Sequence, residues 1–265
     1  MRSSAADSGA RTGTLKVLPI ASSSKGNAYV VVCGDEALLI DCGVPFKTLK
    51  GRLEDKLGGE ALPKLLAVLV THNHSDHVSG LKVLLNKFDV PVFANAMTAE
   101  AAIRQEHLDE AAFCLFENGQ AFDVGPFLVS PFSIPHDAAD PVGYLVRAEG
   151  ETYFHGTDIG TPLDSVGLKL AEADVATLES NHDPVMLRTS LRPECLKQRI
   201  AGPRGHLSND DAASLVKRFA SPRLRQIFLA HLSGECNAPH LALGVMRETL
   251  VEMARTDIAV EIAGS

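Results

Sequence analysis

The sequence has no apolar run long enough to cross a membrane and no C-x-x-C pair. A membrane-spanning helix needs roughly 18–20 consecutive apolar residues. The longest apolar stretches here are much shorter, for example residues 65–70. The five cysteines are an odd number and are scattered along the chain. Neither a disulfide framework nor a zinc–thiolate site is therefore indicated, and we expect reduced, mostly buried thiols.

The start of the chain lacks the apolar core of a secretory signal. Small polar side chains dominate the first dozen residues, so residues 1–13 are predicted to be a disordered tail and the protein to be cytoplasmic. The chain of 265 residues is 45% hydrophobic and 22% charged, which is enough for a substantial core. We predict one domain over residues 14–265, because no repeat and no linker is visible.

An excess of positive charge is missing as well. The net charge of −8 argues against a protein that coats nucleic acid with its whole surface. Residues 185–225 nevertheless contain nine basic and three acidic residues. Taken alone, this local excess favours a solvated helical face over an anion-binding surface.

Short apolar runs alternate with segments of helical periodicity, which predicts an α/β protein whose helices lie outside two packed sheets. The expected strands are residues 15–20, 29–33, 37–40, 65–70, 91–94, 113–116, 121–131, 142–147, 151–155, 175–178, 226–230 and 258–262. The expected helices are residues 46–57, 80–88, 98–106, 193–200, 208–219 and 238–254.

Four candidate metal ligands follow the apolar strand 65–70: His72, His74, Asp76 and His77. This H-x-H-x-D-H spacing arises by chance on the order of once in a thousand such sequences. Imidazole and carboxylate ligands suit zinc, iron or manganese. A sharply turning loop would let His72 and His74 face one ion while Asp76 and His77 face another. Two ions about 3.5–4 Å apart need further ligands, including a bridging carboxylate.

The missing ligands have candidates at the ends of later strands, namely His136, Asp158 and His231. With them the pattern resembles the metallo-β-lactamase superfamily of dinuclear hydrolases. The resemblance extends to its VicX/YycJ branch, because eight segments match in order from about residue 22 to residue 231: SSSKGNAYV, LLIDCG, VTHNHSDHVSGL, PHDAADPVGY, GTDIG, LESNHDPVMLR, GHLSNDDAA and LAHLS.

The resemblance implies a fold and a ligand set. The fold is a four-layer αβ/βα sandwich, in which two mixed β-sheets pack face to face with helices outside. His72, His74 and His136 would bind the first metal. Asp76, His77 and His231 would bind the second, and Asp158 would bridge the two ions. Asp41, at the end of strand 37–40, would accept a hydrogen bond beneath residues 72–77, the metal loop, and orient a ligand histidine.

Members of the branch are described as bacterial nucleases acting on DNA, so the resemblance implies a metal-dependent phosphodiesterase, a DNA exonuclease. A hydroxide bridging two divalent ions would attack phosphorus. Zinc is the first choice, with manganese or iron next. Only 72 residues separate Asp158 from His231, so the clamp domain that related nucleases insert there is expected to be absent. The basic segment occupies that interval, which shifts its interpretation toward anion binding.

Further residues are candidates for catalysis and substrate binding. His206 precedes a helix with a Ser208–Asp211 capping box. With Glu179 as partner, it would donate a proton to the leaving oxygen. A similar His and Glu do this in related tRNA-processing nucleases. A histidine ahead of a cap is otherwise usually solvent-facing. Asp76 and His182 complete the catalytic candidates. The substrate-binding candidates are Ser24 and Asn27, in a turn that could cradle a phosphate or simply close a hairpin, with Asn181, Arg188 and Arg204.

Three alternatives to a DNA nuclease remain open. The acidic net charge and the missing clamp favour a small-molecule phosphodiesterase, acting on a cyclic compound or a nucleotide. An iron-dependent oxidoreductase could use the same ligands, although no flavin or thiol partner site is visible. A non-catalytic scaffold is the third, although the complete ligand set argues against decay. DNA is the expected partner, with no membrane and no obligate protein partner.

Overall fold

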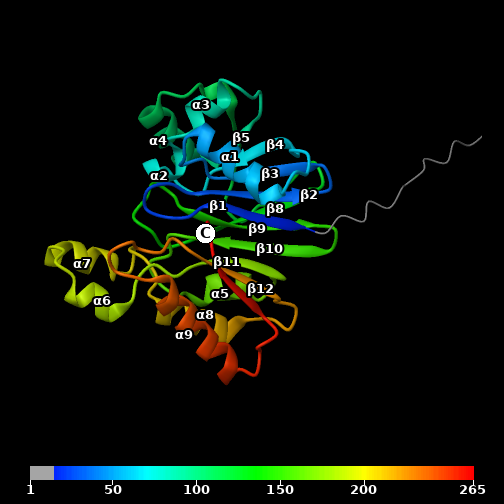
Figure 1. Ribbon diagram of the computed structural model, residues 1–265. Coiled ribbons are helices and arrows are strands. Elements are labelled where there is room, and N and C mark those ends of the chain that lie inside the picture. Colours follow the sequence, from blue (N-terminus) through cyan, green and yellow to red (C-terminus); the bar gives the residue numbers. More distant parts are fainter. Residues whose placement is uncertain (1–14) are drawn as a thin grey trace, which may run out of the picture.

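The computed structural model describes residues 15–265, which form two β-sheets packed face to face with helices on both outer faces (Figure 1). The predicted tail at residues 1–13 lies outside the described residues. The expected αβ/βα sandwich is confirmed, with two mixed sheets flanked by helices. No clamp domain is inserted between Asp158 and His231, an interval occupied by short helices and two strands of the second sheet.

The first sheet has the strand order β1-β2-β3-β4-β5-β6. Its first three strands form an antiparallel meander, and β3 through β6 run parallel. The strands are β1 Lys16–Ala21, β2 Ala28–Cys33, β3 Glu36–Ile40, β4 Lys64–Leu69, β5 Val92–Asn95 and β6 Phe113–Phe116.

The second sheet repeats this division into an antiparallel and a parallel part. Its strand order is β13-β12-β11-β10-β9-β8-β7, with β10 through β13 parallel and β7 through β10 antiparallel. The strands are β7 Phe122–Val124, β8 Phe127–Ser133, β9 Val142–Ala148, β10 Glu151–Gly156, β11 Val175–Glu179, β12 Gln226–Ala230 and β13 Ala259–Ile262.

Three apolar layers hold these elements together. One lies between the sheets, one under α1, α3 and α4, and one under α5, α8 and α9. Strand β2 is covered by two of these layers. Tyr29 and Val31 point into the layer between the sheets, while Val30 and Val32 pack on the helix side. A strand covered on both faces is apolar along its whole length. The helices are α1 Phe46–Leu57, α2 Ser75–Val78, α3 Leu81–Leu85, α4 Ala96–Glu106, α5 Asp164–Leu170, α6 Pro184–Thr189, α7 Glu194–Ile200, α8 Asn209–Phe219 and α9 Pro239–Glu252, with a short 3₁₀ turn at Glu110–Ala112.

Polar residues follow the carboxyl ends of several strands. Asp41 follows β3, Asp158 follows β10 and His231 follows β12, and all three have a positive φ, between 56° and 60°. Residues other than glycine rarely adopt this left-handed conformation, and it is concentrated at functional sites, where the surrounding structure enforces it. The sandwich therefore places the candidate ligands at one edge of the two sheets.

The structure corrects some predicted elements. Residues 121–131 form two strands, β7 and β8, because Gly125 in a left-handed conformation and Pro126 make a turn between them. Helices α5 and α6, of seven and six residues, were not predicted. The metal loop also contains the short helix α2. Among residues 15–265 the longest helix, α9, has 14 residues, so none of the described helices could span a bilayer.

Gly43 tests how tightly the metal loop packs on the first sheet. A Cβ at Gly43 would lie 1.6 Å from the Asp76 carbonyl oxygen. We expect Gly43→Ala to lower the free energy of unfolding by about 1–3 kcal/mol through overpacking and to weaken metal binding, measured by thermal melts with and without divalent metal. Gly51→Ala is the matched control, because its Cβ would meet nothing within 4 Å and alanine favours the α1 helix. Equal melting temperatures for the two variants would contradict this packing.

Candidate metal centre

His72, His74 and His136 form the first group of potential metal ligands. One donor atom from each lies within 4.8 Å of the others. His72 Nε2 and His74 Nδ1 are 3.2 Å apart. Two ligands at the usual zinc–nitrogen distance from a tetrahedral ion lie roughly 3.3 Å apart, so this spacing suits a shared ion.

Asp76, His77 and His231 form the second group. Asp76 Oδ2 lies 3.5 Å from His77 Nε2 and 3.6 Å from His231 Nε2. Asp76 and His77 belong to α2, one turn of helix in the metal loop, whereas His231 arrives from the end of β12 in the other sheet. The two sheets therefore both contribute to this group.

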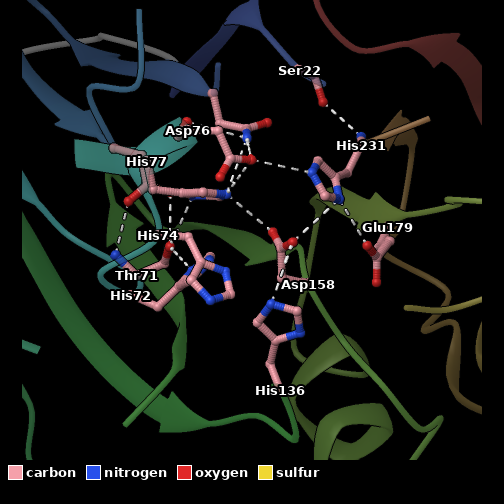
Figure 2. A network of polar contacts seen from close by, with 12 residues as sticks. Ser22, Thr71, His72, His74, Asp76, His77, His136, Asp158, Glu179 and His231 are labelled. Carbon is pink, nitrogen blue, oxygen red and sulfur yellow. Dashed lines mark hydrogen bonds and ion pairs between the residues drawn. The ribbon is translucent and has the colours of Figure 1, made fainter. Parts of the chain in front are cut away.

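Asp158 lies between the two groups, as Figure 2 shows. Its Oδ2 is 3.3 Å from His77 Nε2, and its Oδ1 is 3.8 Å from His136 Nε2. The carboxylate is buried, and Oδ2 has no hydrogen-bond partner among the described residues. This is the position that a bridging carboxylate requires.

The metal loop is anchored from below by Asp41. Thr71 donates its backbone N–H to Asp41 Oδ1 and its hydroxyl to Asp41 Oδ2, each at 2.8 Å. His77 Nδ1 donates to Asp41 Oδ2 at 2.7 Å. The Thr71 hydroxyl hydrogen is thereby used, so His72 Nδ1, 3.0 Å away, must donate to the Thr71 oxygen. Both histidines consequently turn Nε2 toward the centre.

The second sheet orients its histidines in the same way. His136 Nδ1 donates to the Gly205 carbonyl oxygen at 3.0 Å, and His231 Nδ1 donates to Glu179 Oε1 at 3.0 Å. The Nε2 atoms of His136 and His231 are buried without a hydrogen-bond partner among the described residues. Buried polar groups are rarely left unpaired, and a bound cation satisfies these nitrogens. The donor set therefore fits divalent metal ions.

Protonation also favours a cation. Burial lowers the pKa of His72 and of His136, which leaves these rings neutral and able to act as ligands. Burial opposes ionisation of Asp158, but the neighbouring His231 and His77 hold its pKa well below the ordinary value. The centre thus combines the neutral rings of His72 and His136 with an ionised carboxylate. Against the effect of burial, neighbouring carboxylates raise the pKa of His77 and of His231, so a cation bound there would displace the protons of these two rings.

The centre opens into a cavity of about 210 Å³. Of the expected substrate contacts, Ser24 and Asn181 line this cavity, as does His206. The Asn181 amide also donates to the His231 carbonyl oxygen at 2.7 Å, so it supports the last ligand loop.

Four other expected residues do not line the cavity within residues 15–265: Asn27, His182, Arg188 and Arg204. Asn27 is buried, and its amide donates to Asp76 Oδ2 at 3.2 Å, so it orders the metal loop. His182 is buried beside α8. Arg188 is exposed, and Arg204 Nε donates to the His136 carbonyl oxygen at 3.3 Å. The structure thus places these four residues outside the cavity wall, and their expected roles stay predictions.

The chain is similar in sequence and in fold to known proteins. A family model described as the β-lactamase superfamily domain matches residues 36–231. Exodeoxyribonuclease WalJ of Streptococcus pneumoniae is 32% identical over 92% of this chain and 90% of its own, and exodeoxyribonuclease YycJ of Bacillus anthracis is 34% identical over 88% of each. The chain belongs to the WalJ/YycJ branch of the metallo-β-lactamase superfamily. Its fold matches the metallo-β-lactamase fold protein YhfI of Bacillus subtilis, with a TM-score of 0.70, 20% identity and coverage of 94% of this chain and 97% of that one.

Membership in the WalJ/YycJ branch identifies the chain as a metallo-β-lactamase-fold hydrolase with a divalent metal centre. Beside that centre, His206 Nδ1 donates to Glu179 Oε1 at 2.8 Å. Burial alone would lower the pKa of His206, but the Glu179 carboxylate outweighs burial and raises it above the ordinary histidine value. A protonated ring at the cavity wall can donate a proton.

Two residues of the WalJ/YycJ-type centre were not predicted from the sequence. Thr71 links Asp41 to His72, and its position directly before the ligand motif was the available signal. Ser22 accepts the backbone N–H of His231 at 2.7 Å and the Tyr29 hydroxyl at 2.7 Å. Ser22 begins the matching segment SSSKGNAYV, but its contact with His231 joins residues 209 positions apart, so the sequence did not indicate this role.

Asp41 provides a test of this support. Asp41→Asn keeps the shape of the side chain but removes the charge that holds His77 and Thr71. We expect roughly 10–100-fold weaker divalent-metal affinity, the usual effect of losing such a partner, measured by chelator competition. The control is Asp123→Asn on the exposed part of β7, which should bind metal as the wild type does. Unchanged affinity in Asp41→Asn would show that the rings keep their orientation without it.

Proposed function

We propose that this chain is a dinuclear metal-dependent exodeoxyribonuclease. The proposal rests on the two ligand groups with the buried Asp158 carboxylate between them, and on His206, paired with Glu179, at the wall of the same cavity. The names of the WalJ and YycJ relatives support DNA as the substrate, since they match about nine-tenths of this chain and of their own length. The basic segment 185–225 supports a polyanionic substrate as well.

In this proposal the ligands divide as the geometry suggests. His72, His74 and His136 hold one ion, and Asp158 contributes to both sites. Asp76, His77 and His231 hold the other ion. Bound divalent metal supplies Lewis acidity at the scissile phosphodiester and activates the attacking water. Zinc suits the histidine-rich donor set best, with manganese or iron next.

His206 is the proposed general acid. Its Nδ1–H is held by Glu179 Oε1, which fixes the ring and keeps it protonated, so Nε2–H is the free donor for the leaving oxygen. Glu179 itself is buried, and the charge and hydrogen bond of His206 help to lower its pKa to about 2 against the effect of burial. Glu179 therefore stays ionised while His206 gives up its proton.

A small-molecule phosphodiesterase is the second candidate. The cavity of about 210 Å³ and the net charge of −8 favour a small substrate over a polymer. A nuclease and a small-molecule enzyme would share the ligands and His206. They differ in whether a DNA end or a nucleotide diester is the better substrate, which one comparison of turnover settles.

The function is tested by incubating metal-loaded protein with end-labelled DNA, a cyclic nucleotide and bis-p-nitrophenyl phosphate. We expect stepwise release of mononucleotides from DNA ends and about two metal ions per chain by elemental analysis. Asp158→Ala should reduce both occupancies, because its carboxylate lies between the two groups, and should abolish cleavage. Asp164→Ala, on exposed α5, is the control and should keep both ions. A fully active enzyme with one ion per chain, or one that cleaves only the cyclic nucleotide, would contradict the proposal.

His206→Ala tests the general acid. We expect both metals to remain and kcat on DNA to fall by roughly 10²–10⁴-fold, the usual contribution of a general acid. The loss on bis-p-nitrophenyl phosphate should be smaller, because p-nitrophenolate leaves without protonation. An equal loss on both substrates, or loss of metal, would remove His206 from this role.

A further inference from the structure

Helices α6 and α7 form an arm, residues 184–204, that projects at one side of the molecule, apart from the helices that cover the sheets (Figure 1). The arm has five basic residues and one acidic residue, in a chain with a net charge of −8. Its turn is exposed, and Leu191 is 103% exposed. The arm therefore presents local positive charge beside the metal centre.

One face of the arm forms part of the cavity wall. Arg192, Leu196, Arg199 and Ile200 all line the cavity that contains the ligand groups. Their spacing of four, three and one residues places them on one side of α7 and the turn before it. Two aliphatic side chains thus accompany two guanidinium groups on this face.

Both arginines are paired with carboxylates through a single nitrogen. Arg192 Nε donates to Glu235 Oε2 at 3.0 Å, and Arg199 Nε donates to Asp137 Oδ2 at 2.6 Å. A guanidinium has five N–H donors, so each arginine keeps further donors for a phosphate. The Arg192 side chain is 25% exposed and that of Arg199 is 63% exposed, so both are reachable from solvent.

The other basic residues of the arm have different positions. Lys197 Nζ donates to the Arg188 carbonyl oxygen at 2.8 Å, which ties α7 to α6. Arg204 Nε contacts the His136 carbonyl oxygen, which supports the loop of a ligand. Within the described part of the chain, Arg188, Lys197 and Arg204 do not line the cavity.

We propose that this face of the arm is a nucleotide-holding wall, in which Arg192 and Arg199 bind phosphates of a polynucleotide end and Leu196 and Ile200 contact the sugar and base between them. The proposal rests on the proposed nuclease function and specifies the residues that select a polymer over a small diester. Glu235 competes with the substrate phosphate for Arg192.

The first experiment compares Arg192→Ala and Arg199→Ala on single-stranded DNA and on bis-p-nitrophenyl phosphate. Each variant should lose roughly tenfold more kcat/KM on DNA than on the small diester, the cost of one charged hydrogen bond. The slope of log kcat/KM against log salt should become shallower by about 0.7 for each phosphate that is no longer bound. Arg247→Ala, on the exposed face of α9, removes the same charge and should leave both activities unchanged.

The second experiment uses Glu235, which is exposed and contacts Arg192. Glu235→Gln should raise kcat/KM on DNA about two- to fivefold, because it frees Arg192 from a surface ion pair. In the Arg192→Ala background the same change should have no effect. This double-mutant cycle tests the interaction between Glu235 and Arg192 rather than the overall charge.

Several outcomes would contradict the proposed nucleotide-holding wall. Equal losses on DNA and on the small diester would make the two arginines structural, and an equal loss from Arg188→Ala would make the arm a diffuse positive surface. A Glu235→Gln gain that persists without Arg192 would contradict the competition. Wild-type protein that turns over bis-p-nitrophenyl phosphate but leaves DNA intact would contradict the proposed nuclease function itself, whatever the arginine variants show.

Discussion

The hydrogen bonds that the buried Glu179 carboxylate accepts hold together one side of the candidate metal centre. Its Oε1 accepts the Nδ1–H groups of His206 and His231, and its Oε2 accepts the backbone N–H groups of Ile159 and Leu207 at 2.7 and 3.0 Å. Burying a charge is costly unless hydrogen bonds compensate it, and these four donors do so. Through one side chain, the loops after β10 and β12 and the segment before α8 are held together. A histidine of the ligand set and the proposed general acid are consequently oriented by the same group.

Asp41, at the end of β3, has the same part in the first sheet as Glu179 has in the second. It accepts hydrogen bonds from Thr71 and His77, as Glu179 does from the loops of the second sheet. Neither carboxylate belongs to the two proposed ligand groups, yet each determines which ring nitrogen faces the centre. Two buried anions at the carboxyl ends of strands, one in each sheet, therefore orient histidines from opposite sides of the cavity. Asp41, Asp158 and His231, which have a left-handed backbone conformation, all lie at strand ends around this centre.

The short interval between Asp158 and His231 has a functional consequence. No clamp domain is inserted there, and α7 with the turn before it contributes Arg192, Leu196, Arg199 and Ile200 to the cavity wall. Close backbone approaches fix the base of the arm, since a Cβ at Gly160 would lie 2.5 Å from the Arg204 Cα. The end of the arm thus packs closely against the loop that contains Asp158. The proposed nucleotide-holding wall and the candidate ligand Asp158 therefore belong to neighbouring parts of the chain.

The sequence by itself determined the alternation of elements and most of the candidate ligands. Strands covered on both faces are continuous apolar runs, and four of the seven proposed ligands lie within six residues, so both signals are local. Only the tertiary structure decided that Glu179 holds His231, because these residues are 52 positions apart and meet where β11 pairs with β12. It also decided that Arg192 and Arg199, but not Arg188, line the cavity, and that Asn27 is buried. The number of basic residues in a segment does not show which of them face the cavity. That depends on how each helix or loop packs against the rest of the chain.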